Sequence, residues 1–264
     1  MAGVRSFNTV RARSYLVRLP LFTRAMILII LVFWLLGAQS VWDVRKWGAL
    51  IPDQVGFATA YRINTFPLIH LNIFHTLLNI LALTPLLERF ESEYGTLTTL
   101  ALFFGPLTTV PAIVYLIIET FIFRGNNAVM GASMWIFLLL GIEAIRTYRT
   151  NPYLVIATHQ IPTWTTPLAL ILVVAALVPN TSLLGHLCGV AMGYFCGLGY
   201  LKYLAPPEWA LRFIEGKLNL LAILPHYVSV DQKTYGRFGV LPSANRTGGS
   251  APTELVGSTQ RLGP

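Results

Sequence analysis

Two residues of types that carry out nucleophilic chemistry lie inside long apolar stretches of the sequence. Ser133 follows Gly131 by two residues, and His186 lies between Gly185 and Gly189. A serine hydroxyl becomes a strong nucleophile only beside a general base, and a neutral imidazole can be that base. A lone serine in a membrane helix usually bonds to its own backbone. The hypothesis of a reactive pair therefore needs a reason for the two side chains to meet.

Depth and glycine spacing both favour such a meeting. Ser133 and His186 each lie six residues after an asparagine, Asn127 and Asn180. At 1.5 Å per residue, both side chains would lie about 9 Å below the points where their helices begin. Four glycines at intervals of four begin at Gly185, and such a stripe lets a neighbouring helix approach closely. We therefore expect a hydroxyl and an imidazole at the same level.

A second polar group lies in an earlier apolar stretch, which contains His70, Asn72, His75 and Asn79. His75 and Asn79 are four residues apart, so they share one helical face and can point into one cavity. A simpler interpretation is that they only form hydrogen bonds between helices. No Asp or Glu lies in a predicted span near His186, so a third carboxylate of the kind found in a triad is missing. The arrangement would be a Ser-His dyad.

These residues must be positioned by membrane helices. Of 264 residues, 55% are hydrophobic and 11% are charged, whereas soluble domains are roughly a quarter charged. Several uncharged stretches reach the ~18 residues of a spanning helix. We expect an all-α, polytopic membrane bundle of six transmembrane helices, near residues 22–40, 64–87, 96–119, 128–145, 164–179 and 183–204.

The basic residues predict the orientation of this bundle. If six spans are present, 15 of the 19 Lys and Arg lie on the side that carries both termini, and that side should be cytosolic. The net charge of +8 then reflects topology, not nucleic-acid binding. We divide the chain into a basic cytosolic N-terminus (1–24), a membrane domain (25–204), a cytosolic amphipathic interfacial segment (205–231) and a disordered cytosolic tail (232–264).

Three motifs, in this order and in these spans, resemble those of the rhomboid intramembrane proteases. The resemblance covers roughly residues 60–204 and rests on His70-x4-His75-x3-Asn79, Gly131-x-Ser133 and Gly185-His186-x-x-Gly189-x-x-x-Gly193. Two positions depart from the usual family pattern. Tyr61 replaces a tryptophan in the first loop, and Met134 follows the serine where glycine is frequent.

The resemblance implies a serine protease that cuts single-pass membrane proteins and needs no cofactor or metal. Ser133 would be the nucleophile and His186 the base, while His75, Asn79 and the Ser133 backbone N–H would stabilise the oxyanion. Supporting roles would fall to Arg62, His70, Glu91, Gly131, Phe137, Gly189 and Gly193.

The long polar tail resembles that of the fungal Golgi type of rhomboid, which processes sterol-response transcription factors. This resemblance implies a Golgi membrane, with the endoplasmic reticulum as the alternative. The last residues resemble an SHP box, which docks on a AAA unfoldase of the valosin-containing type; its docking residues would be Gly257, Arg261 and Leu262.

Two other interpretations compete with a protease. A rhomboid-like pseudoprotease would bind membrane clients without cleavage, but it should lack the nucleophile or the base, and both are present. A transporter or metal-binding protein could use His70, His75 and His186. Such a protein would be expected to carry an intramembrane carboxylate, a paired charge or a His-Glu-x-x-His motif, and none of these accompanies the three histidines in the sequence.

Overall fold

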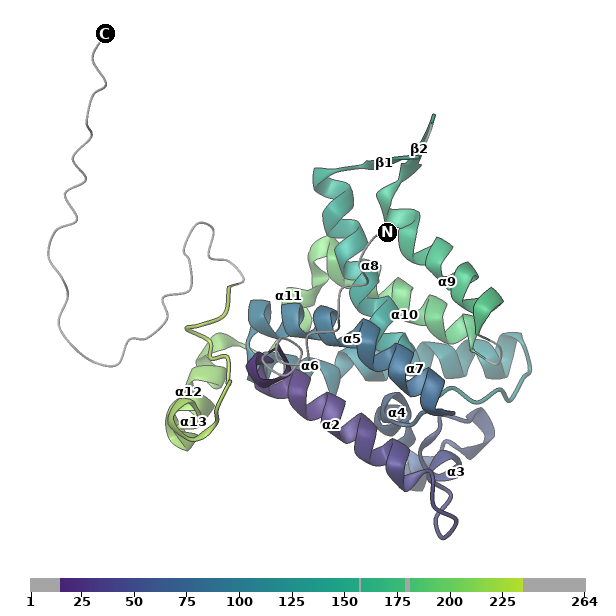
Figure 1. Ribbon diagram of the computed structural model, residues 1–264, viewed down its shortest axis with the longest axis horizontal. Helices are drawn as coiled ribbons and strands as arrows, with labels where there is room; N and C mark the ends of the chain where they lie inside the picture. The colour runs from purple at the N-terminus through teal and green to yellow at the C-terminus, as the bar shows by residue number, and fades with distance from the viewer. Residues whose placement is uncertain (1–14, 157, 179–180, 235–264) are drawn as a thin grey trace, which may run out of the picture.

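The computed structural model describes residues 15–156, 158–178 and 181–234, and these residues are mostly helical (Figure 1). Helix α8 (Ser133–Thr150) packs against α5 (Ile73–Tyr94), α7 (Pro106–Ile117), α9 (Thr166–Leu177) and α10 (Leu183–Phe195). The side chain of Trp135 on α8 is fully buried, and its indole N–H donates to Thr108 Oγ1 at 2.7 Å. The helix that begins at Ser133 thus lies in the core of the bundle.

Four of the six predicted spans correspond closely to observed helices. Helix α9 occupies the predicted fifth span, and α2 (Leu21–Leu36) occupies the first. The third and sixth spans are each interrupted. They consist of α6 (Thr96–Phe103), α7 and a π-helical turn Ile118–Ile122, and of α10, a π-helical turn Cys196–Tyr200 and α11 (Leu201–Leu204).

The predicted second span, 64–87, is wrong in its first part. Short helices α3 (Val44–Gly48) and α4 (Arg62–Thr65) and three 3-10 turns, Pro52–Gln54, Phe57–Thr59 and Phe66–Leu68, precede α5. The chain then bends by 77° between Phe57–Leu68 and Ile73–Tyr94. Asn72 stands at the bend in extended conformation, and its side chain accepts from His75 N–H at 2.8 Å. This cap starts a new helix.

The predicted fourth span, 128–145, is displaced by five residues, because α8 begins at Ser133 itself. Gly131 has φ +106°, a value that does not continue an α-helix. Just before it, Val129 and Leu50 exchange two backbone hydrogen bonds of 2.9 Å. An extended segment therefore carries the chain to Ser133, and the predicted depth of six helical residues is wrong.

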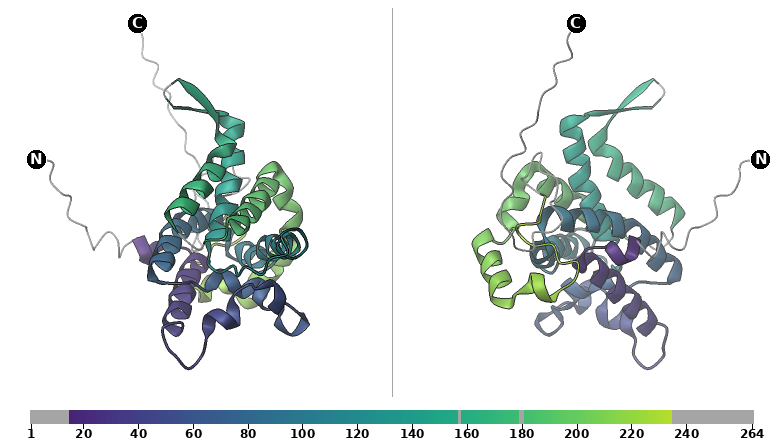
Figure 2. Two further views of the ribbon diagram at one scale, coloured as in Figure 1. Left: turned by 90° about the vertical axis from the view of Figure 1, so that its right-hand side faces the viewer. Right: turned by 60° about the vertical axis from the view of Figure 1, so that its left-hand side comes forward.

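One feature was not predicted from the sequence: a β-hairpin in the connection between α8 and α9. Strands β1 (Tyr153–Ile156) and β2 (His159–Pro162) pair antiparallel and project from the bundle (Figure 2). A 3-10 turn, Thr163–Thr165, leads from β2 into α9.

The segment after the last span folds back onto the bundle. Helices α12 (Glu208–Leu218) and α13 (Leu220–Ile223) follow α11, and residues 224–234 return toward the start of α6. There Thr96 N donates to Val228 O at 2.8 Å, and Leu21 N donates to His226 O at 2.9 Å. Of residues 232–234, predicted to be disordered, Thr234 donates from its backbone N to Ser92 O of α5 at 3.1 Å, and Lys233 bonds to Glu208 of α12. The rest of the predicted tail, 235–264, lies outside the described residues.

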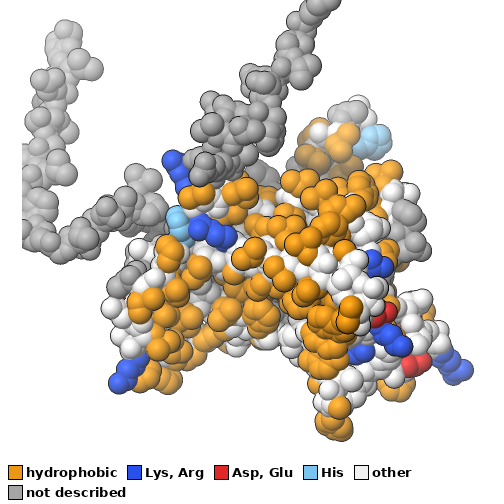
Figure 3. All heavy atoms as spheres, turned by 60° about the horizontal axis from the view of Figure 1, so that its bottom comes forward, with side chains coloured by type: hydrophobic (Ala, Val, Ile, Leu, Met, Phe, Trp, Pro, Cys, Tyr) orange, Lys and Arg blue, Asp and Glu red, His pale blue; other side chains and the backbone are white. Residues whose placement is uncertain are grey.

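Apolar side chains cover much of the face of the bundle that Figure 3 shows. Leu28, Leu81, Leu172 and Leu177, from three helices, are each more than 60% exposed. A soluble monomer rarely shows so continuous an apolar surface. Within the described residues, helices Thr96–Ile122 and Leu183–Leu204 are long and apolar enough to cross a membrane, and the bent pair around Asn72 would make a third span. The surface is that of an integral membrane protein.

A buried carboxylate holds the first helix in place. Glu91, on α5, is completely buried. It accepts hydrogen bonds of 2.8 Å from Phe22 N, Thr23 N and Thr23 Oγ1, and one of 2.7 Å from Thr96 Oγ1. The first turn of a helix presents unpaired N–H groups and a partial positive charge. Glu91 thus supplies the cap that Pro20, at the N-cap of α2, cannot provide with its own side chain.

We expect Glu91→Ala to lower the free energy of unfolding by at least ~3 kcal/mol, because buried donors on α2 would lose a charged acceptor. Reversible unfolding of the purified protein in mixed micelles measures this change. Glu88→Ala is the matched control, since Glu88 lies on the same helix and, among the residues that the structure describes, accepts only from Tyr15 OH at the surface. An equal loss in both variants would contradict the capping role.

Candidate active site

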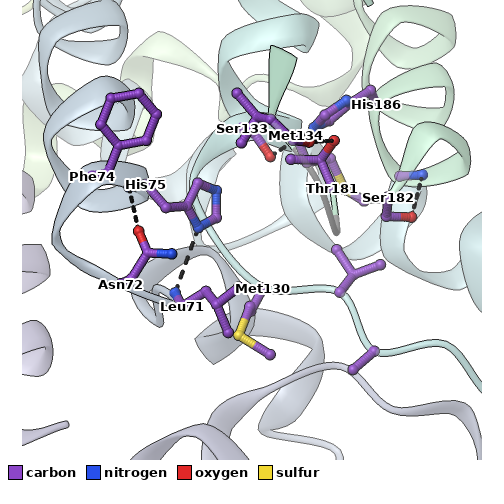
Figure 4. Close-up of a pocket in the computed structure, with 14 residues that line it drawn as sticks. Leu71, Asn72, Phe74, His75, Met130, Ser133, Met134, Thr181, Ser182 and His186 are labelled. Carbon is purple, nitrogen blue, oxygen red and sulfur yellow. Dashed lines mark hydrogen bonds between the residues drawn. The ribbon is translucent and has the colours of Figure 1, made fainter. Parts of the chain in front are cut away.

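Ser133 and His186 meet in the lining of a cavity of about 370 Å³ (Figure 4). The Nε2 atom of His186 lies 3.0 Å from the Oγ atom of Ser133. His186 is 2% exposed and lies one turn inside α10, whose N-cap Ser182 accepts from Gly185 N at 3.1 Å. The distance is within the hydrogen-bonding range required of a nucleophile and its base.

Glycines bring the two helices together. A Cβ atom added to Gly189 would lie 2.5 Å from Met134 O, and one added to Gly193 would lie 2.2 Å from Leu138 O. Both distances are too short for any side chain. On the facing helix, a Cβ atom added to Gly141 would lie 2.9 Å from Val190 O and 3.1 Å from Gly193 Cα. The close contact predicted from the glycine spacing is confirmed, and it places α10 directly against the backbone of α8.

The second ring nitrogen of His186 has no hydrogen-bond partner within the part of the chain that the structure describes. A triad would place a carboxylate there. The imidazole instead packs on Phe137, with ring centroids 4.5 Å apart and planes inclined by 37°. Packing against an aromatic ring therefore orients the imidazole, and this contact is consistent with the supporting role that the resemblance implies for Phe137.

Ser133 is the first residue of α8. The N–H groups of the first helical turn have no acceptor within the helix, and they carry a partial positive charge. Negative charge that develops beside Ser133 Oγ would therefore be stabilised by the helix itself. The sequence prediction, which placed Ser133 deeper in the helix, included the Ser133 N–H as an oxyanion donor but not the partial positive charge of a helix start.

His75 lies on the side of the cavity opposite His186 (Figure 4). A Cβ atom on Gly131 would lie 2.7 Å from His75 Cε1, so a side chain at position 131 would collide with the imidazole. His70 packs beside His75, with ring centroids 5.2 Å apart, and its Nε2 accepts from Ala132 N at 3.3 Å. Gly131 and His70 thus hold the backbone that leads into Ser133.

The structure does not bring the side chain of Asn79 into the cavity. Asn79 is 4% exposed, and its Nδ2 donates to His75 O, in its own helix, at 2.8 Å. Its Oδ1 has no partner among the described residues. Asn79 lies on the same helical face as His75, as predicted. Its amide, however, is hydrogen-bonded to the helix backbone and does not point into the cavity.

The remaining predicted residues lie outside the cavity. Arg62 is buried and its Nη1 donates to Ala49 O at 2.8 Å, so it ties together the connection before α5. Tyr61, the departure from the family pattern, stacks on Trp47 with centroids 5.1 Å apart. Glu91 acts on α2, as described above. Gly257, Arg261 and Leu262 lie outside the described residues.

Several cavity residues were not assigned to the site from the sequence. They come from the bend before α5, from the extended segment before α8 and from the start of α10: Leu71, Asn72, Phe74, Ala128, Met130, Thr181 and Ser182. Their only sequence signal is proximity to the motif residues. Met134 also lines the cavity. The replacement of the frequent glycine by methionine at this position therefore affects the shape of the cavity.

Comparison with known proteins agrees with this geometry. Residues 57–203 match the family model described as Rhomboid domain. The chain therefore belongs to the rhomboid family of intramembrane serine proteases. It is 65% identical to Rhomboid-type serine protease 2 of Gibberella zeae over 263 residues, which cover 99% of this chain and 98% of the relative.

Other fungal relatives are similar along nearly their whole length. Identity is 66% with Rhomboid-type serine protease 2 of Neurospora crassa, over 98% of this chain and 95% of the relative. It is 60% with Rhomboid-type serine protease B of Aspergillus fumigatus, over 98% of this chain and 96% of the relative. Serine protease activity and an integral membrane location follow from this membership.

We expect Gly193→Ala to slow the reaction of Ser133 with a fluorophosphonate probe by at least about tenfold. The added methyl group would collide with Leu138 O, the helices would separate, and small displacements of reacting groups cost large rate factors. Gly216→Ala is the matched control, because no atom lies within 4 Å of a Cβ there, and it should label at the wild-type rate. A wild-type rate for Gly193→Ala would contradict the proposed role of the contact.

Proposed function

We propose that the protein hydrolyses peptide bonds of membrane-anchored substrates through a Ser133–His186 dyad. The observation that supports this most strongly is the 3.0 Å approach of His186 Nε2 to Ser133 Oγ inside a cavity. His186 accepts the hydroxyl proton as Ser133 Oγ attacks the carbonyl carbon. The proton then passes to the leaving amine, the C–N bond breaks and an acyl-enzyme remains. Water, deprotonated by His186, hydrolyses the ester and restores the serine.

The developing oxyanion is stabilised by hydrogen-bond donors that line the cavity. The Ser133 N–H at the start of α8 and the His75 imidazole are candidates, each worth ~3 kcal/mol of the barrier. Asn79 is a third candidate. Its Nδ2 now donates to His75 O, so a rotation about the side-chain torsions would have to turn the amide toward the cavity.

We propose six spans for the membrane domain: α2, α5, α6 with α7, α8, α9, and α10 with α11. With 15 of the 19 Lys and Arg on the side of the termini, both ends face the cytosol, and substrates are cut toward the other side. Protease treatment of sealed vesicles of native orientation tests this topology. A C-terminal tag that stays shielded from external protease would exclude it.

The substrates that we propose are single-pass membrane proteins, including the precursor of a sterol-response transcription factor, in the Golgi membrane or the endoplasmic reticulum. Support comes from the resemblance to the fungal Golgi type of rhomboid. For the tail, we propose that Gly257, Arg261 and Leu262 dock on a AAA unfoldase of the valosin-containing type, which would extract the cleaved product.

We expect wild-type protein to react with a fluorophosphonate, Ser133→Ala not to react, and His186→Ala to react at least about 100-fold more slowly. The probe reports the pair because an unassisted serine hydroxyl is a weak nucleophile. In-gel fluorescence against time measures the rate. Ser40→Ala and His159→Ala, both exposed and remote from the cavity, are matched controls and should label normally. Normal labelling of His186→Ala would exclude the imidazole as the base.

In cells, we expect Ser133→Ala to leave the sterol-response precursor unprocessed, and Arg261→Ala to reduce co-purification of the unfoldase without loss of peptide cleavage in vitro. Arg246→Ala, in the same tail, is the control. Immunoblots of precursor and product, pull-downs and fractionation against Golgi and endoplasmic-reticulum markers give the readouts. Processing by the Ser133 variant would contradict the substrate proposal. Unchanged unfoldase recovery with the Arg261 variant would contradict the docking proposal.

A further inference from the structure

A second cavity, of about 540 Å³, lies at the end of the bundle remote from Ser133 and shares no residue with the first. Arg149 is sixteen residues after Ser133 in α8, about 24 Å along the helix axis. The lining comes from the ends of α5 and α8, from the start of α6, from the π-helical turn Cys196–Tyr200, from α11 and from the segment after the last span. Its volume is within the range of ligand sites.

Four basic side chains line this cavity, and two of them are not neutralised. Arg146 pairs with Glu93 at 2.8 Å and with Glu143 at 3.0 Å, and Lys233 pairs with Glu208. The hydrogen bond from Lys233, together with its charge, lowers the pKa of Glu208, so this carboxylate stays ionised. Arg149 and Lys202, by contrast, have no carboxylate partner within the described residues. The cavity therefore carries an excess of positive charge.

The two unneutralised cations are available to a ligand. Arg149 uses Nη2 to donate to Leu198 O at 3.0 Å, and a guanidinium has further donors to offer. Lys202 is exposed, with Nζ 4.9 Å from the ring of Tyr203. Between them the backbone turns at Gly199, where φ is +110° and a Cβ would meet no atom within 4 Å. The turn leaves open space beside both side chains.

The two cations stand at the ends of two different helices. Cations near a helix C-terminus complement its partial negative charge, and Arg149 is so placed on α8. Lys202 lies in the last turn of α11 and faces the same cavity. Any anion there would be held by these side chains against the helix dipoles, so their removal should weaken its binding.

We propose that this cavity binds the phosphate of an anionic phospholipid headgroup. The protein is embedded in a bilayer whose hydrocarbon core is ~30 Å thick, so a cavity about 24 Å from Ser133 lies near the headgroups of one leaflet. Basic pockets between membrane helices on the cytosolic side suit such headgroups, and this side is cytosolic in the proposed topology. Arg149 would supply paired donors to the phosphate oxygens and Lys202 a point charge.

Binding of dioctanoyl phosphatidic acid to the full-length protein in neutral detergent tests this proposal. Replacing both Arg149→Gln and Lys202→Gln should weaken binding by about tenfold, as expected for two partly exposed charged contacts. The matched control is Arg45→Gln with Lys46→Gln, which removes the same charge from exposed α3 and should bind like wild type. Fluorophosphonate labelling of each variant reports that the fold is intact.

Two further probes distinguish an anionic lipid headgroup from a zwitterionic headgroup and from free phosphate. Dioctanoyl phosphatidylcholine should bind at least tenfold more weakly than phosphatidic acid, and so should inorganic phosphate. Equal binding of either probe, or unchanged affinity in the double variant, would overturn the proposal. If the double variant does not label, Lys202→Gln alone provides the same test, with a loss of about threefold expected from one exposed contact.

Discussion

The structure depends on the direct backbone contact between α8 and α10. At Gly189 and Gly193 the helices approach so closely that a single methyl group would collide with carbonyl oxygens of α8. In a membrane, where lipid tails solvate apolar side chains well, such close packing is a main source of helix association. The contact also sets the distance between Ser133 and His186, because each residue lies near the start of one of these two helices.

Side-chain packing and backbone geometry hold Ser133 and His186 in position on these two helices. The imidazole of His186 leans on Phe137 where a triad would supply a carboxylate, and Ser133 begins its helix where the N–H groups are unpaired. Gly131 serves the site in two ways. Its positive φ turns the chain into α8, and its lack of a side chain leaves room for His75. The site is thus held by aromatic packing and by backbone conformation, and none of the contacts named here is a buried ion pair.

The pairing of Ser133 with His186 could be predicted from the sequence because it follows from residue type and from the period of four in the glycines. The start of α8 could not, since it depends on the bridge between Val129 and Leu50, which lie far apart in the chain. The return of the segment after α13 to Thr96 also depends on long-range hydrogen bonds that leave no local pattern. The β-hairpin could not be predicted for a different reason, because its short apolar strands resemble fragments of a membrane helix in composition.

Hydrolysis of a single-pass model substrate in liposomes tests the central claim most directly. Wild-type protein, Ser133→Ala and His186→Ala would be reconstituted at equal density, and the cleaved product would be quantified by mass spectrometry over time. The dyad predicts that wild type cleaves within the membrane-anchored segment, that Ser133→Ala forms no product, and that His186→Ala is slower by at least about 100-fold. Product formation by Ser133→Ala at the wild-type rate, from folded protein, would contradict the account.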